Sequence, residues 1–310
     1  MMKRGRDVNK GKIYIAGSIS LDIIMGKIGN WPEWGTEILT KENQLRVGGP
    51  VVNSAAVMVA DGFDVEIVSA VGDDFMGEII FDTFDKLGIN TSKINVIKGQ
   101  TPFSVGIKHT EGERSFFTSE GIMNNIDIYK HLKYLLDLKN SHILINSVNL
   151  IPGFQAPEMD KFLSEIDSSN KVYLDSGWPV GGWTPQYRSH ISKLIQKSQW
   201  FLPNETEIVN LMNTENLREA LRKYKELFTT PIVVKCGKKG AVIYENGYMT
   251  EVGTEKSDSV KDTIGAGDSF NAAFIMKKYA GCKSEYCAEY SNEKAKKWVE
   301  GYFSDKIHLA

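Results

Sequence analysis

The sequence has few cysteines, and none of them forms a metal-binding or disulfide pattern. Only Cys236, Cys282 and Cys287 occur among 310 residues. No pair has CxxC spacing and there is no HExxH motif, which disfavours a structural zinc site and a zinc protease. Free thiols in small number are typical of a reducing compartment, so we expect a cytoplasmic protein.

The sequence also lacks long hydrophobic runs and a strong net charge. No stretch approaches the roughly 18 apolar residues of a membrane span. The basic first twelve residues are followed by IYIAG, which is too short for a signal peptide. A formal net charge of -2 provides no basic field for nucleic acid. We therefore expect neither a membrane nor nucleic acid as a partner.

What the sequence does contain is an alternation of short β-branched runs and amphipathic stretches. The runs that predict strands are 12–18, 65–72, 142–148, 171–177, 200–204 and 231–237, with an NG-turn hairpin over 241–252. The stretches that predict helices are 51–62, 74–88, segments near 133, 161 and 193, and two helices from Gly267 onward. This alternation predicts a largely parallel sheet that is covered by helices on both faces.

Two segments break the alternation. Residues 31–47 and 102–119 have polar alternation that is typical of strands, with little helical signal. We expect both to form a small separate sheet, which would act as a lid over an active site. Because there is no internal repeat and no low-complexity linker, the chain is predicted to be one domain over 1–310.

Residues 262–268 read DTIGAGD and point to phosphate chemistry. The backbone of Gly265, Ala266 and Gly267 could wrap closely around a phosphate at a helix N-terminus. Asp268 among those N–H groups suits a general base that takes a proton from a hydroxyl beside an anion hole. The alternative is a helix cap or an ordinary first-turn acid after a glycine turn.

Two common nucleotide-binding motifs are missing. The chain contains no GxxxxGK[ST], which excludes a P-loop enzyme. Phe270 stands where GxGxxG needs its last glycine, which disfavours a dehydrogenase.

Four motifs together resemble the PfkB, or ribokinase-like, family of carbohydrate and nucleoside kinases. They are VGGPVVNSAAVMVADGF (47–63), PNETE (203–207), VVKCGKKGAVIY (233–244) and DTIGAGDSF (262–270). They occur in the order of the family and span nearly the whole chain. The resemblance implies a ribokinase-like three-layer αβα sandwich with a largely parallel central sheet and a small β lid.

The resemblance also implies roles for individual residues. Asp268 would be the catalytic base, and Gly265, Ala266 and Gly267 would form the anion hole. The residues implied in the sugar pocket are Asp22, Gly48, Gly49 and Asn53. The residues implied at the nucleotide are Asn204, Glu207, Lys235, Gly237 and Gly240.

Cofactors and assembly follow from the same resemblance. ATP would be the phosphoryl donor, and Glu207 would order the water shell of Mg²⁺. Asp262 could help to hold a monovalent cation such as K⁺. Lid segments often pair between subunits in this family, so a homodimer through the lid is the expected assembly.

Each implied role has a plainer alternative. Asp22 could be a turn residue at a strand end, Asn53 a helix cap, and Glu207 an acid that interacts with a helix dipole. Asn292 could lie at the adenine edge or on an exposed helix face. Ser20 and Pro50 depart from the pattern of ribokinase itself, which weakens that particular assignment.

The expected activity is ATP-dependent phosphorylation of a hydroxyl on a small sugar or sugar acid. A nucleoside kinase of the same family is the first alternative. A silent ligand-binding or regulatory protein is the second, and the retained Asp268 argues against it. The sequence leaves open which compound is the acceptor and which of its hydroxyls is phosphorylated.

Overall fold

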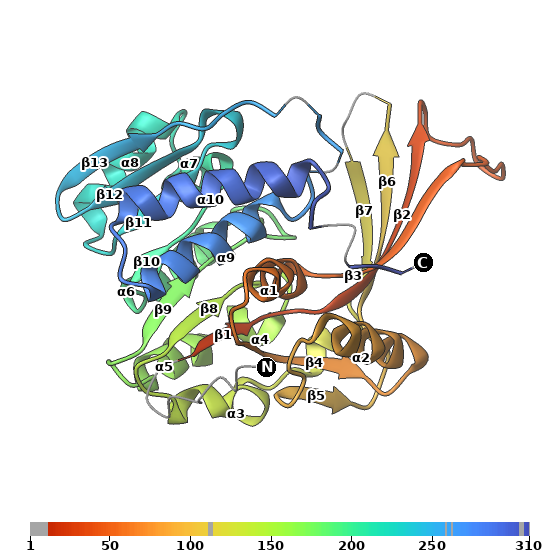
Figure 1. Ribbon diagram of the computed structural model, residues 1–310, viewed down its shortest axis with the longest axis horizontal. Coiled ribbons are helices and arrows are strands. Elements are labelled where there is room, and N and C mark those ends of the chain that lie inside the picture. Colours follow the sequence, from red (N-terminus) through yellow and green to blue (C-terminus); the bar gives the residue numbers. More distant parts are fainter. Residues whose placement is uncertain (1–11, 111–113, 258, 262, 304–306, 310) are drawn as a thin grey trace, which may run out of the picture.

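A nine-stranded sheet forms the centre of the computed structural model, which describes residues 12–110, 114–257, 259–261, 263–303 and 307–309 (Figure 1). The strand order is β13-β12-β11-β10-β9-β8-β1-β4-β5. The strands are β1 Ile13–Ala16, β4 Val65–Gly72, β5 Ile94–Ile97, β8 His142–Ile145, β9 Lys171–Leu174, β10 Trp200–Phe201, β11 Ile232–Lys235, β12 Ala241–Glu245 and β13 Tyr248–Val252. Neighbours from β5 to β11 pair in parallel, and the hairpin of β12 and β13 adds antiparallel strands at one edge.

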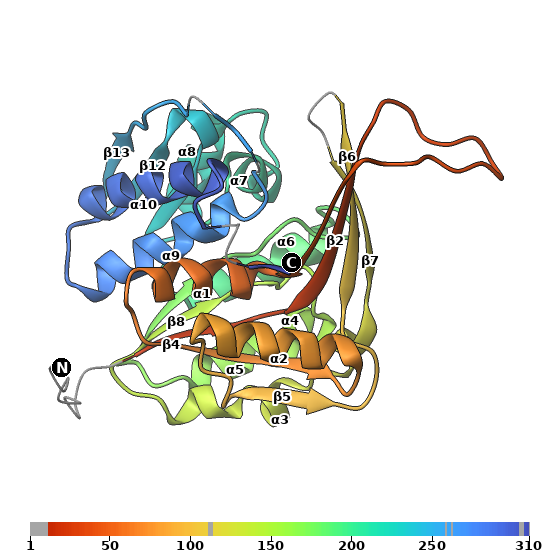
Figure 2. The same cartoon turned by 45° about the vertical axis from the view of Figure 1, so that its right-hand side comes forward.

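Helices cover both faces of this sheet, which confirms the predicted three layers (Figures 1 and 2). One face packs against α1 Pro50–Ala60, α2 Phe75–Leu87, α9 Ala266–Tyr279 and α10 Ser284–Val299. The other packs against α3 Ile128–His131, α4 Pro152–Gln155, α5 Pro157–Glu165, α6 Pro185–Gln196, α7 Glu205–Met212 and α8 Leu217–Leu227. Among the described helices, none combines the length and apolar content that crossing a bilayer would need.

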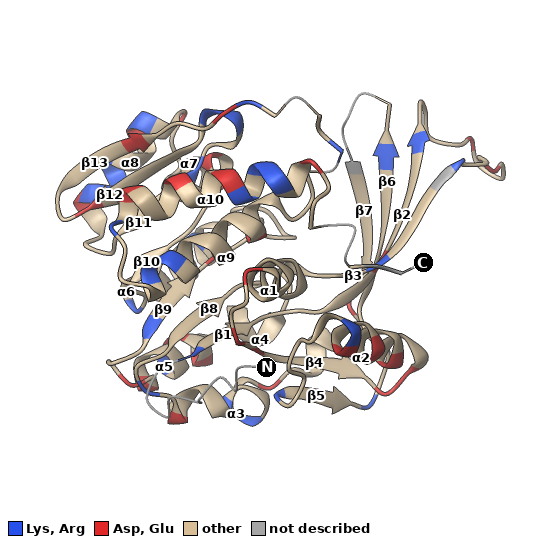
Figure 3. Ribbon diagram, viewed as in Figure 1, with Lys and Arg blue, Asp and Glu red and all other residues tan. Residues whose placement is uncertain are grey.

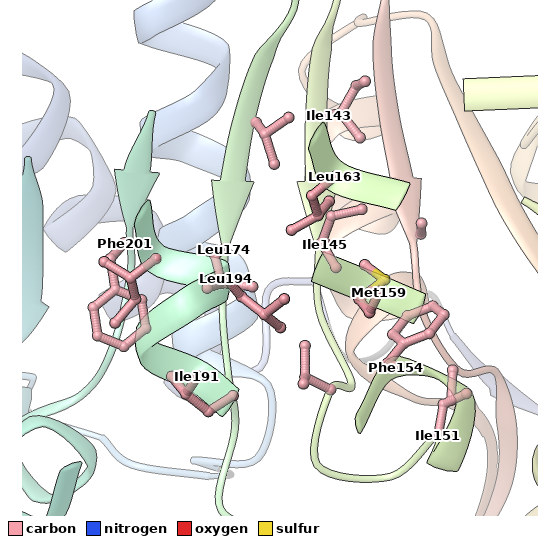
Figure 4. Close-up of a cluster of buried hydrophobic side chains, with 14 of the residues drawn as sticks. Ile143, Ile145, Ile151, Phe154, Met159, Leu163, Leu174, Ile191, Leu194 and Phe201 are labelled. Carbon is pink, nitrogen blue, oxygen red and sulfur yellow. The ribbon is translucent and has the colours of Figure 1, made fainter. Parts of the chain in front are cut away.

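The alternation of side chains along each strand explains why both faces are buried. Ile143 and Ile145 of β8 join one hydrophobic cluster, whereas Leu144 between them joins the cluster on the opposite face. Figure 4 shows the first of these clusters, where strand residues meet Leu163 of α5 and Leu194 of α6. Burying each such side chain stabilises the fold by roughly 1.5–3 kcal/mol.

A second, five-stranded sheet stands beside the central one, on the right of Figure 1. Its order is β14-β3-β2-β6-β7, and we call it the smaller sheet. Its strands are β2 Ser20–Ile28, β3 Glu42–Gly48, β6 Phe103–His109, β7 Arg114–Ser119 and β14 His308–Leu309. Strands β6 and β7 lie within the predicted segment 102–119.

The other predicted segment of the smaller sheet needs correction. Residues 29–41 contain no strand, and the strand begins only at Glu42. Pro32 has no N–H to donate, and Gly35 turns the chain with φ +80°, so this stretch cannot continue a ladder. Strand β2 was not predicted, because Ser20 and Asp22 interrupt its apolar pattern.

Candidate active site

The polar residues of the candidate site gather at the carboxyl ends of the parallel strands. Asp175 follows β9, Asn204 follows β10, and Lys235 ends β11. Helix α9 begins at the same edge, so its N-terminus points toward these side chains. In open α/β sheets, ligands bind at this edge because loops and helix N-termini converge there.

Two adjoining cavities bring most of the predicted residues together. The first, of about 350 Å³, is lined by Asn204, Glu207, Lys235, Gly237, Gly267 and Asp268, among others. The second, of about 180 Å³, is lined by Asp22, Gly49, Asn53 and Asp268, among others. Asp268 lines both cavities, so its carboxylate can contact a ligand in either one.

Asp268 occupies the first turn of α9 without capping it. The N-cap is Gly265, and no side chain accepts a capping hydrogen bond there. Instead, Asn53 Nδ2 donates to Asp268 Oδ2 at 2.8 Å, which holds the carboxylate toward the cavities. Burial raises the pKa of Asp268 to about 7, although the hydrogen bond from Asn53 offsets part of that rise.

The glycines of the turn before α9 have different structural reasons. Gly265 has φ +88°, and a Cβ there would lie 2.5 Å from the ring of Trp298. The indole N–H of Trp298 donates to the carbonyl of Ile264, so α10 fixes the shape of the turn. A Cβ on Gly267 would have Lys235 Nζ as its nearest neighbour, at 3.6 Å. Gly267 therefore leaves open space at the start of α9, where it lines the first cavity, whereas Ala266 N–H donates to the carbonyl of Thr263 at 3.3 Å.

Lys235 lies in a buried network that the sequence did not predict. Its Nζ donates to Asp175 Oδ2 at 2.8 Å and to Asn271 Oδ1 at 3.2 Å. Burial alone would lower the pKa of Lys235, but the carboxylates of Asp175 and Glu207 raise it above its ordinary value. Asp175 directly follows a buried strand, and that position was the one signal in the sequence that could have identified it.

Asn204 and Glu207 form a capping box at the start of α7. Glu207 N–H donates to Asn204 Oδ1, and Asn204 N–H donates to Glu207 Oε2, both at 2.8 Å. Burial raises the pKa of the Glu207 carboxyl, and the nearby Asp175 carboxylate raises it further. Glu207 thus has the helix-end position that was its plainer alternative, and it also lines the first cavity, where the nucleotide role was predicted.

The donor set of the first cavity suits a cation held mainly through water. The carboxylates of Glu207 and Asp175 repel one another there, and Lys235 balances only one of them. Within the described ranges, no three His, Cys, Asp or Glu residues come close enough to hold a metal ion on their own. Mg²⁺ prefers oxygen ligands and retains waters, so these residues fit it.

Of three other predicted glycines, only Gly49 lines one of the two cavities, and Gly48 and Gly240 do not. A Cβ on Gly48 would lie 2.1 Å from the Asp22 carboxylate, so Gly48 leaves room for that side chain. Gly49 is the N-cap residue of α1, with φ +96°. Gly240 has φ +95° and packs against the carbonyl of Val252, and it is not among the residues that line the first cavity.

The three polar residues whose roles were open have different outcomes. Asp262 lies outside the described residues, so the predicted cation site is untested. Asn292 is buried and donates to the carbonyls of Val252 and Gly253, which rules out an exposed helix face. The cap of α1 is Gly49 with no side-chain bond, so Asn53 is not a helix cap.

Comparisons with known proteins agree with the motifs. A model described as pfkB family carbohydrate kinase matches residues 13–302. An uncharacterized sugar kinase from Archaeoglobus fulgidus is 26% identical, over 78% of this chain and 93% of its own. A nucleoside kinase from Methanocaldococcus jannaschii is also 26% identical, over 89% and 86%. The structure of Arabidopsis thaliana ribokinase complexed with ribose and ATP superposes with a TM-score of 0.77, at 23% identity, covering 94% of this chain and 93% of that one.

Proposed function

The chain belongs to the pfkB family of carbohydrate kinases, which are ATP-dependent kinases of sugars and nucleosides, and on that premise we propose that it phosphorylates a hydroxyl of a small sugar or sugar acid. The observation that carries this proposal is the position of Asp268 in both cavities. ATP would occupy the first cavity and the acceptor the second. The phosphoryl group would then move from ATP to the acceptor beside the Asp268 carboxylate.

Asp268 acts as the general base in this mechanism. Its carboxylate accepts the proton of the acceptor hydroxyl as the oxygen attacks the terminal phosphorus of ATP, while the bond from that phosphorus to the bridging oxygen breaks and ADP leaves. A pKa of about 7 keeps a usable fraction ionised at neutral pH while giving the carboxylate more basicity than an exposed aspartate has. Asn53 holds the carboxylate in place through its hydrogen bond to Oδ2.

The start of α9 and Lys235 stabilise the charge of the phosphoryl group. The backbone N–H groups of the turn at Gly265, Ala266 and Gly267 form the anion hole. Lys235 adds a buried positive charge beside Gly267, and Asp175 and Asn271 keep its ammonium group in position. Because these groups are already oriented, little reorganisation is needed when charge develops in the transition state.

Glu207 and Asn204 complete the nucleotide side. Glu207 would hold Mg²⁺ through water molecules, and the ion would neutralise charge on the ATP phosphates when bound. Asn204 fixes the orientation of the Glu207 carboxylate through the capping box. Gly237 leaves the end of β11 open to the nucleotide, since a Cβ there would have no neighbour within 4 Å.

The smaller sheet would act as a lid that excludes water from the second cavity. Ser104, Phe116 and Thr118 of this sheet line the cavity. Without water in the cavity, ATP could not be hydrolysed before its phosphoryl group is transferred to the acceptor. A homodimer through this sheet, a K⁺ requirement and a cytoplasmic location stay predictions.

A nucleoside kinase is the alternative that a specific observation favours, because the Methanocaldococcus jannaschii relative is named for that activity. The same catalytic residues would serve either acceptor. Product identity distinguishes the two, since only the acceptor differs.

The proposal is tested by ADP release with MgATP and K⁺ across sugars, sugar acids and nucleosides. Wild type and Asp268→Asn are assayed together, and we expect a hit whose rate falls about 10²–10⁴-fold in the variant. ATP binding should be nearly unchanged, which calorimetry checks. Normal turnover by Asp268→Asn would contradict the base assignment. If the wild type binds ATP but releases no ADP with any acceptor, the result would instead support a catalytically silent binding protein.

A further inference from the structure

A chain of hydrogen bonds at the end of β8 fixes the side chain of Asn146. Ser18 donates twice to Ser147 Oγ, from its backbone N–H and from its hydroxyl, both at 3.0 Å. The hydroxyl of Ser147 in turn donates to Asn146 Oδ1 at 3.3 Å. Because Oδ1 accepts this bond, the orientation of the amide is determined, and Nδ2 is the end left for another partner.

The backbone beside Asn146 is shaped to hold this arrangement. Gly17, directly after β1, leaves room for the amide, since a Cβ there would collide with Asn146 Oδ1. Ser147 has φ +60°, in the left-handed region that side chains with a Cβ rarely adopt. The other described non-glycine residues with positive φ are all asparagines, which tolerate that conformation. Backbone strain of the kind seen at Ser147 is concentrated at functional sites.

The donor end of Asn146 has no partner among the described residues. Asn146 is only 2% exposed, and its Nδ2 is buried without a hydrogen bond to any part of the chain that the structure describes. Leaving a buried N–H group unpaired destabilises a protein, so such groups are rare in native structures. Asn146 lines the first cavity and is not among the residues that line the second. A ligand in the first cavity that offers an oxygen would therefore pair this donor.

The strand order places Asn146 at the boundary between the two cavities. Strands β11, β10 and β9 lead to Lys235, Asn204 and Asp175, which line the first cavity. Strand β1 leads to Ser18, which lines the second cavity. Strand β8, which Asn146 follows, lies between β9 and β1 (Figure 1). With ATP in the first cavity and the acceptor in the second, the terminal phosphoryl group would be transferred at this boundary.

The strands at this boundary bring no charge of their own. Strands β8 and β1 contain no Lys, Arg, Asp or Glu (Figure 3). Among the described residues that line the first cavity, the only basic side chain is Lys235, whose ammonium group faces Asp175 on the nucleotide side. A phosphoryl oxygen at the end of β8 therefore needs a neutral donor, and the amide of Asn146 provides one.

We infer that Asn146 Nδ2 donates a hydrogen bond to a non-bridging oxygen of the terminal phosphoryl group of ATP. This inference rests on the proposed function and adds a residue to its machinery. The bond holds the phosphoryl group at the boundary between the cavities, and no proton leaves the amide. Ser147 and Ser18 act through Asn146, so they are positioning residues.

The test measures nucleotide binding without an acceptor, so it does not depend on turnover. Calorimetry gives the dissociation constants of MgADP and of the magnesium complex of β,γ-imido-ATP, an analogue that keeps the terminal phosphoryl oxygens. We call the constant of the analogue divided by that of MgADP the nucleotide ratio. In Asn146→Ala this ratio should rise about tenfold over wild type, because hydrogen bonds to charged oxygens are among the strong ones.

Asn149→Ala is the matched control. Asn149 lines the same cavity, but its Nδ2 already donates to the carbonyl of Trp178 at 3.0 Å. The nucleotide ratio of this variant should equal that of wild type. A rise as large as that of Asn146→Ala would overturn the inference, because any truncation at the cavity wall would then have the same effect.

A second variant keeps the test decisive if Asn146→Ala folds poorly. Ser147→Gly removes the hydroxyl that orients the amide, and glycine adopts φ +60° without strain. The nucleotide ratio should rise several-fold, and less than in Asn146→Ala. If both variants leave the ratio unchanged, whether or not they weaken both nucleotides equally, the terminal phosphoryl group is not the partner of Asn146 and the inference is wrong.

The inference and the proposed function can fail separately. A raised nucleotide ratio in Asn146→Ala, without ADP release by the wild type on any acceptor, would support the contact and contradict the kinase activity. ADP release by the wild type, with an unchanged ratio in both variants, would do the reverse. A wild type that binds neither nucleotide would contradict both.

Discussion

The two cavities that meet at Asp268 differ in how their walls are built. In the first, Lys235 and Asp175 lie at the ends of central strands, and both are hydrogen-bonded to Asn271 of helix α9. In the second, the smaller sheet contributes Phe116 and Thr118, which are exposed. Phosphate chemistry requires charges that are fixed before the reaction, and a packed sheet provides that rigidity. At the exposed positions Phe116 and Thr118, side chains can change with little cost to the fold, whereas Asp22 and Asn53 of the same cavity are buried.

The largest expected effect is on stability and concerns the buried network of Lys235 in the first cavity. Lys235→Met should lower the free energy of unfolding by about 3–5 kcal/mol, because it leaves the buried Asp175 carboxylate without its cation. Chemical denaturation measures this change. Lys108→Met on the smaller sheet is the matched control and should stay within about 0.5 kcal/mol. A similar loss of unfolding free energy in both variants would contradict the expected difference between the buried network of the first cavity and the exposed smaller sheet.

The next largest effect concerns Asp268, which lines both cavities. Since Asp268 has a pKa of about 7, lowering the pH below 7 protonates it and removes the base. We expect kcat/KM to fall about 50-fold from pH 7 to pH 5, because about half of the Asp268 carboxyl groups are ionised at pH 7 and about 1% at pH 5. Circular dichroism over the same range would verify that the protein stays folded. A flat profile between pH 5 and pH 8 would contradict the role of Asp268.

A smaller effect, on substrate affinity, is expected for Asp22 in the second cavity. Asp22→Ala removes a carboxylate that is predicted to accept from acceptor hydroxyls, and it should raise the acceptor KM by about 10-fold or more. The ATP KM should change by no more than about twofold, because Asp22 does not line the first cavity. Steady-state kinetics with each substrate varied in turn separates the two. Equal rises in both constants would indicate a structural role.

The smallest effect is a gain in stability. The folded pKa of Asp268 lies above its ordinary value of 3.8, so its contribution to stability is lost as the pH rises through about 7. Asp268→Asn should therefore stabilise the protein by about 1–2 kcal/mol at pH 8. This corresponds to a rise of a few degrees in Tm by calorimetry. The gain should vanish near pH 4, and a gain that persists there would have another cause.

Local patterns in the sequence predicted much of the fold. The helix expected over 74–88 is α2, from Phe75 to Leu87, with Gly88 in the left-handed conformation after it. Its apolar periodicity and its terminal glycine are both local signals. The strand β2 was missed because Ser20 and Asp22 interrupt its apolar pattern, and its partners β3 and β6 come from later segments of the chain. The helices α7 and α8 were not predicted either.

The candidate site divides in the same way. The sequence by itself determined the Asn204–Glu207 pair, because its two residues bond to each other three positions apart. It also singled out the glycine turn and Asp268 as a short motif, although Trp298 and Asn53 hold them in place from distant parts of the chain. Only the tertiary structure brought Asp175 and Asn271 to Lys235, across separations of 60 and 36 positions. Only the structure brought Arg46 opposite Asp22, on the neighbouring strands β3 and β2. Strand order and packing decide such contacts, and no short stretch of sequence contains that information.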